Sequence, residues 1–336
     1  MLDPDRTKIH GVRSLARLPD AMAAAAIDRF GSPEVLTLHQ LPVPVPDPGE
    51  VLIAVDTAGV GPWDADIRGG WYPGKRPRFP LVLGTDGAGT VAALGSRVRR
   101  FALGDRVYAY AWLNPKGGFY AEYVAVAASV VAPVPQRLDL MHAGAMPTTG
   151  LTALQGCEDA LRLKAGESVI VHGASGGVGT LAVQFARMRG ARVLATASGA
   201  DGVAVVKKLG AEAAVDGHHA DIAEAARRFA PSGLDAVLAF AGGEALDRAL
   251  DALHPGGRLA YPNGVEPEPK RRRGIKVVRY DAIAEPGKFA RLNRAVEQAK
   301  LKVPIAATFP LAEAAKAHER LAAGHVPGKI VLRIRG

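Results

Sequence analysis

The pattern of apolar and polar positions changes character near residue 146. Short β-patterned runs separated by Gly and Pro come first, at 36–60, 87–95, 104–112 and 121–135. From there to about residue 280, short apolar runs alternate with helical patterns, which predicts parallel βαβ units. The chain is therefore expected to be an α/β protein in which a β-rich part precedes a parallel sheet.

Six strands are expected in the second part, at 168–172, 191–197, 213–216, 235–240, 257–263 and 275–280. Six is also the number of strands in a complete doubly wound dinucleotide-binding sheet. Two more helical patterns, 288–300 and 311–324, and an apolar strand at 329–334 follow this part.

The segment after the first of these strands has helical periodicity. Its apolar stripe consists of Val178, Leu181, Ala182, Phe185 and Ala186. Gly190 suits the left-handed conformation that ends many helices. The stripe predicts a helix that packs on the sheet and ends near residue 190.

Composition limits the class of protein. The 336 residues, 48% hydrophobic and 22% charged, are typical of a globular protein with two domains. No apolar run approaches the roughly 18 residues of a membrane span. Residues 1–21 lack the apolar core of a signal peptide, so we expect a flexible N-terminal extension on a cytoplasmic protein without membrane contacts.

Charge and cysteine content exclude two further classes. The formal net charge is +9, but the 42 Lys and Arg are scattered, and the one tight run, 270–273, is typical of a solvated loop. Nucleic acid is therefore not expected as a partner. The single cysteine, Cys157, excludes an intrachain disulfide and a cysteine cage for zinc.

The stretch 172–179, HGASGGVG, carries the first chemical signal and has two interpretations. Residues 173–177 fit the nucleophile elbow G-x-S-x-G of a hydrolase, with Ser175 as nucleophile. Residues 174–179 differ at one position from the dinucleotide fingerprint, and their amides would then hold a pyrophosphate at a helix N-terminus.

The continuation of the turn favours the phosphate-binding interpretation. An elbow ends at Gly177, whereas this turn continues to Gly179, where a missing side chain lets helix and strand pack closely. His318 and His325 follow Ser175 in hydrolase order but lie in ordinary polar contexts. The expected cofactor-binding residues of the turn are Ala174, Ser175, Gly176, Gly177, Val178 and Gly179.

The choice of dinucleotide depends on the end of the second strand, about 20 residues beyond the glycines, where an acidic residue would bind the ribose of NAD. Ser198 stands there, and a hydroxyl leaves room for a 2′-phosphate that a carboxylate would repel. Lys207 or Lys208 follows as a candidate phosphate ligand. The sequence therefore favours NADPH, although Asp201 is close enough to leave NADH open.

Taken together, these motifs resemble the zinc-independent quinone oxidoreductase group of the medium-chain dehydrogenase/reductase superfamily. The resemblance extends from Met22 to the C-terminus. It is carried by the stretches 28–36, 58–73, 83–95, 101–110, 117–124, 148–154, 173–179 and 328–332.

The resemblance implies a GroES-like β-rich catalytic domain joined to a Rossmann domain that holds a doubly wound parallel six-stranded sheet. Residues 22–145 would form the catalytic domain, completed by 281–336, and residues 146–280 would form the NADP-binding domain. It further implies an active site between the two domains, and a homodimer. Fold-level analogy of this kind supports the architecture more strongly than the chemistry.

The zinc-dependent branch of this superfamily holds its metal with a Cys near position 61 and a His-Glu pair near positions 85 and 86. This chain has Gly61, Thr85 and Asp86 there, so no thiolate or imidazole ligand is available and no metal is expected. Hydride would then pass directly to an electron-poor acceptor, a quinone or an α,β-unsaturated carbonyl, which needs orientation more than activation.

Tyr72 matches a tyrosine that lies beside nicotinamide and substrate in relatives. A phenol is protonated at neutral pH, so Tyr72 is the candidate catalytic donor to the substrate oxygen, with packing against the substrate as the alternative. Further positions match nicotinamide and ribose contacts of the family: Thr148, Thr149, Gly242, Gly243, Asn263 and Gly264.

Two positions depart from the family pattern. Gly61 replaces an Asn that contacts nicotinamide or substrate, and His218 or His219 stands where Tyr-Arg often contacts the adenosine phosphate. The expected protein is an NADPH-dependent reductase of small-molecule quinones or enones. A hydrolase that uses Ser175, and a non-catalytic NADPH- or RNA-binding protein, remain as alternatives.

Overall fold

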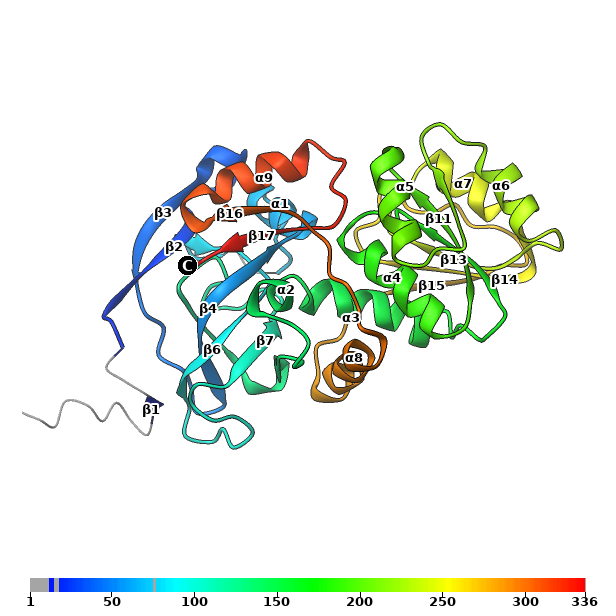
Figure 1. Ribbon diagram of the computed structural model, residues 1–336. Coiled ribbons are helices and arrows are strands. Elements are labelled where there is room, and N and C mark those ends of the chain that lie inside the picture. Colours follow the sequence, from blue (N-terminus) through cyan, green and yellow to red (C-terminus); the bar gives the residue numbers. More distant parts are fainter. Residues whose placement is uncertain (1–11, 15–17, 75–76, 336) are drawn as a thin grey trace, which may run out of the picture.

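The computed structural model describes residues 12–14, 18–74 and 77–335. It has two parts, each built around a large sheet, with helices α3 (Pro147–Gln155) and α8 (Pro286–Ala299) between them (Figure 1). The predicted N-terminal extension 1–21 falls mostly outside the described residues. Within the described part, β1 (Arg13–Ser14) pairs antiparallel with β6, with Arg13 opposite Leu94.

The first part is β-rich, as its sequence pattern predicts. An eight-stranded sheet has the order β16-β17-β4-β6-β7-β9, with β1 on β6 and β8 on β4, and a smaller sheet has the order β3-β2-β5. The strands are β2 (Ala21–Ile27), β3 (Leu36–Pro42), β4 (Glu50–Val60), β5 (Leu81–Val82), β6 (Asp86–Leu94), β7 (Arg106–Tyr110), β8 (Tyr123–Ala127) and β9 (Val131–Pro133). Helices α1 (Pro62–Gly69) and α2 (Leu140–Gly144) belong to the same part.

The C-terminal segment returns to this first sheet. Strand β17 (Lys329–Arg333) pairs antiparallel with β4, with Ile330 opposite Val60, and β16 (Ile305–Pro310) pairs parallel with β17. Helix α9 (Ala314–Ala322) lies between them in sequence and packs on both strands (Figure 1). Residues far apart in the sequence therefore build one β-rich part.

The second part contains the six predicted strands in one sheet of order β12-β11-β10-β13-β14-β15, and every pairing is parallel. This is the doubly wound order 3-2-1-4-5-6. The strands are β10 (Ser168–His172), β11 (Arg192–Ala197), β12 (Ala213–Asp216), β13 (Leu234–Ala239), β14 (Leu253–Pro262) and β15 (Lys276–Tyr280). The helices are α4 (Gly177–Met188), α5 (Gly199–Lys208), α6 (Ile222–Phe229) and α7 (Glu244–Leu250).

Alternation along the central strand explains why helices cover both faces of this sheet. Val169 and Val171 belong to the core that contains α3, α4 and α8, whereas Ile170 packs with α6 and α7. Successive side chains of a strand point to opposite faces, so an unbroken apolar run needs a cover on each side.

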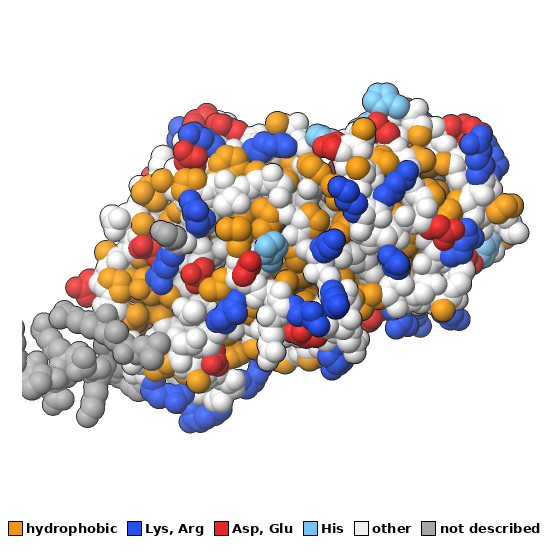
Figure 2. Space-filling model, in the orientation of Figure 1, with side chains coloured by type: hydrophobic (Ala, Val, Ile, Leu, Met, Phe, Trp, Pro, Cys, Tyr) orange, Lys and Arg blue, Asp and Glu red, His pale blue; other side chains and the backbone are white. Residues whose placement is uncertain are grey.

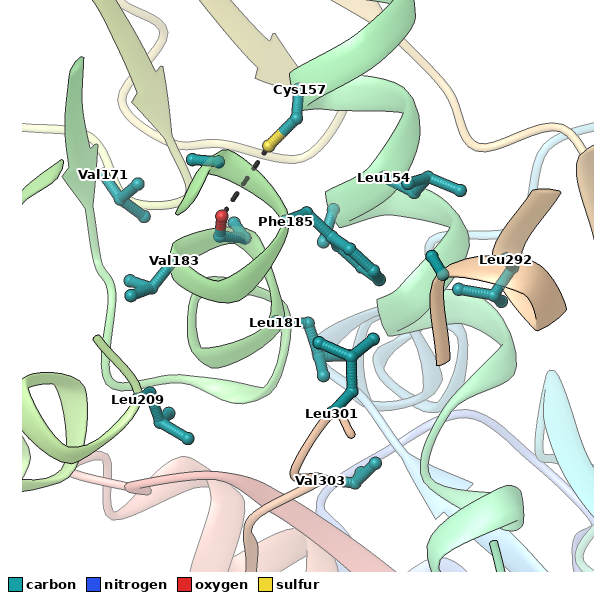
Figure 3. Close-up of a cluster of buried hydrophobic side chains, with 14 of the residues drawn as sticks. Leu154, Cys157, Val171, Leu181, Val183, Phe185, Leu209, Leu292, Leu301 and Val303 are labelled. Carbon is teal, nitrogen blue, oxygen red and sulfur yellow. Dashed lines mark hydrogen bonds between the residues drawn. The ribbon is translucent and has the colours of Figure 1, made fainter. Parts of the chain in front are cut away.

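The apolar stripe of α4 fills the core on the first of these faces (Figure 3). Leu181, Ala182, Phe185 and Ala186 are at most 1% exposed, and Val178 at the start of the helix is half-buried. Cys157 is buried in the same cluster, where its Sγ lies 3.7 Å from the Ala182 carbonyl oxygen. The predicted stripe therefore joins the second sheet to the helices between the two parts.

Lys and Arg side chains are spread over both parts on the face that Figure 2 shows, with Asp and Glu between them. In the basic run 270–273, Lys270 pairs with Asp247 at 2.9 Å, and Arg272 contacts Asp247 and Asp251. None of the helices in the described ranges is both long enough and apolar enough to span a membrane.

Candidate cofactor and substrate site

The glycine turn connects β10 to α4. Gly173 has φ +76°, and the Ala174 N–H donates to the Thr196 carbonyl at 2.8 Å. A Cβ at Gly179 would lie 2.6 Å from the Ala174 Cα, closer than real atoms approach. Gly179 therefore permits the close packing of helix on turn that the sequence predicts.

The N-terminus of α4 is open. Gly176 is its N-cap, no side chain caps the first amides, and a Cβ at Gly176 would meet no heavy atom nearer than 3.7 Å. The first N–H groups of a helix lack internal partners and, with the helix dipole, attract an anion. The residues present therefore fit the pyrophosphate of a dinucleotide.

Ser175 is held as part of the turn. Its Oγ accepts a hydrogen bond from the Ser198 N–H at 3.2 Å, and the residue is 8% exposed. Neither histidine from the hydrolase interpretation pairs with it: His318 is buried against Tyr120 at 3.2 Å, and His325 contacts Ser198. The hydroxyl thus connects the turn to the end of β11, and neither histidine is placed to activate it as a nucleophile.

His325 lies beside Ser198, a contact that sequence reasoning missed. Its Nδ1 is 3.0 Å from Ser198 Oγ and its Nε2 is 2.9 Å from Asp201 Oδ2. The hydrogen bond from this ring lowers the pKa of the Asp201 carboxyl. A hydroxyl and an imidazole therefore face the place where the sequence predicts a 2′-phosphate, and the nearest carboxylate already has a partner.

The backbone around His325 is specialised for this contact. His325 has φ +48°, a left-handed conformation that is uncommon outside glycine, and it follows Gly324 at φ +70°. Arg320 stabilises both residues by donating to the Gly324 carbonyl at 2.8 Å and the His325 carbonyl at 2.9 Å. Local strain that is held in place by a specific side chain is typical of functional positions.

Ser198, His325 and Asp201 are also the residue types of a hydrolase triad. Here the Asp201 and His325 side chains are 59% and 45% exposed, whereas a triad carboxylate is buried. The arrangement is open enough for a phosphate to reach the serine and the imidazole.

Two of the candidate phosphate ligands, both lysines, lie away from this place, whereas the loop of His218 and His219 is nearer: its Gly217 N–H donates to the Ala197 carbonyl at 2.8 Å. Lys207 and Lys208 form the last turn of α5, about 13 Å along the helix axis from Ser198 at its N-cap. The structure does not bring Lys207 together with Ser198. His219 is bonded to Asp216 at 2.8 Å and its side chain is 84% exposed.

A continuous set of contacts leads from the glycine turn into the first part of the molecule. A Cβ at Gly177 would lie 3.4 Å from Thr149 Cγ2 and 3.3 Å from Lys329 Cδ. Lys329 Nζ lies 4.9 Å from the centre of the Trp63 ring, and Trp63 Nε1 donates to Thr85 Oγ1 at 2.6 Å. Gly176 also forms a β-bridge with Gly328. A dinucleotide that extends from the turn would therefore meet residues of both parts.

Trp63 explains the unusual glycine at position 61. A Cβ at Gly61 would approach Trp63 Cδ2 to 3.0 Å and other ring atoms more closely, so the indole occupies the space of the missing side chain. Sequence reasoning noted that Asn is absent from position 61, but it missed that the Trp63 ring fills the space there. The aromatic ring two positions along the chain was the available signal.

Tyr72 lines a pocket at the far end of this path. Ile67, Leu83, Thr85, Ala111 and Leu113 are among its other lining residues, and all of its lining side chains are uncharged. Thr85 belongs both to this pocket and to the contact with Trp63. The structure therefore places the predicted catalytic tyrosine at the end of the path that begins at the glycine turn.

Two buried carboxyl groups support the walls of this site. Asp64 Oδ2 accepts from the Gly61 N–H at 2.9 Å at the start of α1, and Asp86 Oδ2 accepts from the Thr148 N–H at 2.9 Å at the start of α3. Burial raises the pKa of Asp64 to about 7, against the opposing effect of Lys329. The Asp86 carboxylate stands at a position where zinc enzymes carry a ligand, and here it anchors the start of α3.

The remaining predicted cofactor residues lie at the carboxyl ends of β13 and β14. Gly242 has a packing reason, since a Cβ there would lie 2.7 Å from the Glu266 carbonyl. A Cβ at Gly243, whose φ is +95°, or at Gly264, whose φ is +86°, would meet no atom of a more distant residue within 4 Å, so both glycines border open space. Asn263 is bonded to Asp281 and Arg279 at the surface.

Potential metal ligands do not cluster in the part of the chain that the structure describes. Within 12–14, 18–74 and 77–335, no group of three or more His, Cys, Asp or Glu side chains is placed to hold a metal ion. Cys157 is buried in the core of the second part, where burial raises the pKa of its thiol.

Comparisons with known proteins agree with this geometry. A family model described as zinc-binding dehydrogenase matches residues 209–332, and one described as alcohol dehydrogenase GroES-like domain matches residues 47–136. A quinone oxidoreductase of Mus musculus is 33% identical over 326 residues, which cover 93% of this chain and 97% of the relative.

Two solved structures are similar over nearly the whole chain. An NAD-dependent alcohol dehydrogenase has a TM-score of 0.87 at 32% identity and covers 94% of this chain and 100% of its own. A mycobacterial protein in complex with NADPH has a TM-score of 0.82 at 29% identity and covers 93% of this chain and 100% of its own. The names of these two structures mention different dinucleotides, NAD and NADPH. The choice of dinucleotide for this chain therefore rests on the residues around Ser198.

Proposed function

The chain belongs to the medium-chain dehydrogenase/reductase superfamily, in its quinone oxidoreductase group, and is a nicotinamide-dinucleotide-dependent oxidoreductase; we propose that it reduces quinones or α,β-unsaturated carbonyls with NADPH and without a metal ion. The observation that carries this proposal is the path of contacts from the open N-terminus of α4 through Lys329 and Trp63 to the uncharged pocket at Tyr72.

NADPH is favoured over NADH by the arrangement around Ser198. The Ser198 hydroxyl can hydrogen-bond a 2′-phosphate, and His325 Nδ1 would bond the phosphate by exchanging its contact with Ser198 Oγ. His325 Nε2 would still hold the Asp201 carboxylate. Lys207 lies too far along α5 to share this position, so it is not part of the proposed phosphate site.

When bound, NADPH supplies a hydride to the acceptor carbon. The chain's own groups would orient the acceptor and stabilise the charge that develops on its oxygen. The Tyr72 hydroxyl is a donor in a pocket without charged side chains, where hydrogen bonds are stronger than in water. Trp63 and Thr85 would position the nicotinamide ring, which would lie between these two residues and the glycine turn.

Independence of metal is part of the proposal and rests on the identity of three residues. The Trp63 ring occupies the space that a side chain at Gly61 would need. Thr85 Oγ1 accepts a hydrogen bond from the Trp63 indole, and the Asp86 carboxylate accepts one from the Thr148 N–H at the start of α3. Each of these positions already has another role in the packing.

A homodimer is also proposed, by analogy with the family. Strand β15 is an edge of the parallel sheet, and Val277 on it is 41% exposed. An unpaired edge strand is a template for pairing with a second copy, and symmetric pairing of two such edges closes the contact.

The first test is a turnover screen of the purified protein. NADPH consumption is followed with benzoquinone, naphthoquinone and short enones, before and after exhaustive chelation. We expect turnover that survives chelation, because the proposed reaction needs no Lewis acid. Loss of turnover with a chelator, and its recovery with zinc, would contradict the metal-free proposal.

The same screen with Tyr72→Phe tests the donor. Removing one donor to a developing oxyanion typically costs about a hundredfold in kcat. We expect a fall of about tenfold or more in kcat with little change in KM, since the ring still packs. An unchanged kcat would leave Tyr72 with a packing role alone.

Tight, strongly salt-dependent binding to RNA and no turnover with any acceptor would instead favour the non-catalytic alternative.

A further inference from the structure

Two large aromatic side chains stand exposed beside the substrate pocket. Trp71 is 56% exposed and Trp112 is 40% exposed, and their ring centres are 6.1 Å apart. Exposure of large apolar rings to water is unfavourable, so a ligand that covers them gains binding free energy. We call this pair the tryptophan rim.

The tryptophan rim is continuous with the pocket. Trp71 directly precedes Tyr72, and Trp112 lies between Ala111 and Leu113; these three neighbours line the pocket. The exposed indoles therefore stand next to the residues that would contact a bound acceptor.

The backbone holds both tryptophans in place. The Trp71 N–H donates to the Asp66 carbonyl at 2.9 Å, just after the left-handed Gly70 that ends α1. The Ala111 N–H donates to the Thr85 carbonyl at 2.8 Å, and the Asn114 amide donates to the Gly117 and Ala125 carbonyls at 2.7 Å and 2.9 Å. The backbone segments that carry both rings are thus anchored, so these segments need little ordering when a ligand binds.

The geometry of the pair leaves ring faces available. The two indole planes are tilted by 52°, so the rings are not stacked face to face. The face of an indole is electron-rich and attracts the electron-poor ring of a quinone, preferably in an offset stack. The pocket beside the rim offers no charged side chain, which suits an uncharged, flat ligand.

We propose that Trp71 and Trp112 form a subsite that stacks on the distal ring of fused-ring acceptors, and so direct the enzyme toward quinones of two or three fused rings. This rests on the proposed function, because it assumes that the pocket at Tyr72 holds the ring that is reduced. In this proposal the single ring of a benzoquinone lies beside Tyr72 and does not reach the rim. A larger quinone extends out of the pocket onto the indoles.

The test compares benzoquinone with phenanthrenequinone. For Trp71→Ala and Trp112→Ala, we expect KM for phenanthrenequinone to rise about tenfold, while kcat stays within about twofold. KM for benzoquinone should stay within about twofold. Trp71→Phe retains a stacking face and should keep most of the preference. Leu38→Ala, an exposed apolar residue on β3 that does not line the pocket, is the matched control.

Binding without turnover separates this proposal from the proposed function. Phenanthrenequinone is titrated by calorimetry into protein saturated with NADP⁺, which cannot deliver a hydride. We expect the double variant of Trp71 and Trp112 to bind at least tenfold more weakly than the unaltered protein. Equal binding would overturn the subsite. Binding that depends on the rim, in a protein that reduces no quinone, would retain the subsite and overturn the proposed reaction.

Discussion

His325 and Ser198 are 127 positions apart in the sequence, and their side chains are 3.0 Å apart in the structure. Serine at the end of β11 could be interpreted from sequence because its place relative to the glycine turn follows a rule. No such rule places a loop after α9 beside it. Sequence reasoning therefore identified one half of the proposed phosphate site and assigned the other half to Lys207, which is nearer in sequence and farther in space.

At this scale, Ser198→Asp and His325→Gln test the choice of dinucleotide. Ser198→Asp should weaken NADPH binding by about tenfold or more and favour NADH, because the new carboxylate repels a phosphate and can bind a ribose hydroxyl. His325→Gln should weaken NADPH about fivefold and leave NADH within twofold. Both are measured by fluorescence titration.

Lys207→Gln is the matched control for these two variants. It removes a positive charge from the same helix at its other end and should change neither affinity by more than about twofold. Equal dissociation constants for NADPH and NADH in the unaltered protein would contradict the proposed preference.

Trp63 shows a second limit of sequence reasoning at residue scale. The missing Asn at position 61 was visible, but the way an indole folds back over a glycine depends on the backbone of α1 and on Thr85, 22 positions away. A substitution that looks like a loss in the sequence is an exchange of one side chain for another in the structure.

The strand–turn–helix unit of β10 and α4 was the most predictable element. Its strand was predicted with its observed bounds, and its helix follows the predicted apolar stripe. Local order carries the information here, because a parallel strand buried on both faces must be apolar throughout and the helix that follows must present a stripe. The other five strands of the sheet were each found within a few residues of their predicted ends.

Two glycines of this element should separate stability from binding. Gly179→Ala should lower the free energy of unfolding by about 2 kcal/mol, because its Cβ would collide with the Ala174 backbone. Gly176→Ala should cost less than about 1 kcal/mol, because its φ of −73° suits any residue and the space around it is open. Urea unfolding measures both.

Gly176→Ala, the variant that keeps nearly the full stability, should nevertheless lose affinity for the cofactor. Gly176→Ala adds a methyl group where the pyrophosphate would approach, so we expect a weaker dissociation constant for NADPH in a protein of nearly unchanged stability. If Gly176→Ala bound NADPH as well as the unaltered protein, the pyrophosphate would not lie at this end of α4.

At the scale of the whole molecule, the sequence predicted two kinds of domain from two kinds of periodicity. It did not predict how they meet, since the contacts between Gly176 and Gly328, and between Lys329 and Trp63, join segments that no local pattern relates. The pocket at Tyr72 is lined by residues of the first part alone, and that meeting sets its position relative to the glycine turn.

The proposed homodimer is tested at this scale. Val277→Glu places a charge on the exposed edge strand of each copy, and two such charges close to a symmetry axis repel each other. We expect light scattering to give a dimer for the unaltered protein and a mass closer to the monomer for Val277→Glu, with Val277→Thr as the neutral control. An unaltered protein that is monomeric at all concentrations would exclude the dimer.

The loop that carries His325 belongs to the segment that completes the β-rich part, between α9 and β17. If His325 binds the 2′-phosphate, cofactor preference depends on both parts of the molecule and cannot be transferred with one part alone. A chimera that receives only the second part of this chain, from a donor with the same Ser198, would inherit the cradle for the pyrophosphate and lose the discrimination. In evolutionary terms, full discrimination between the two dinucleotides then depends on residues of both parts.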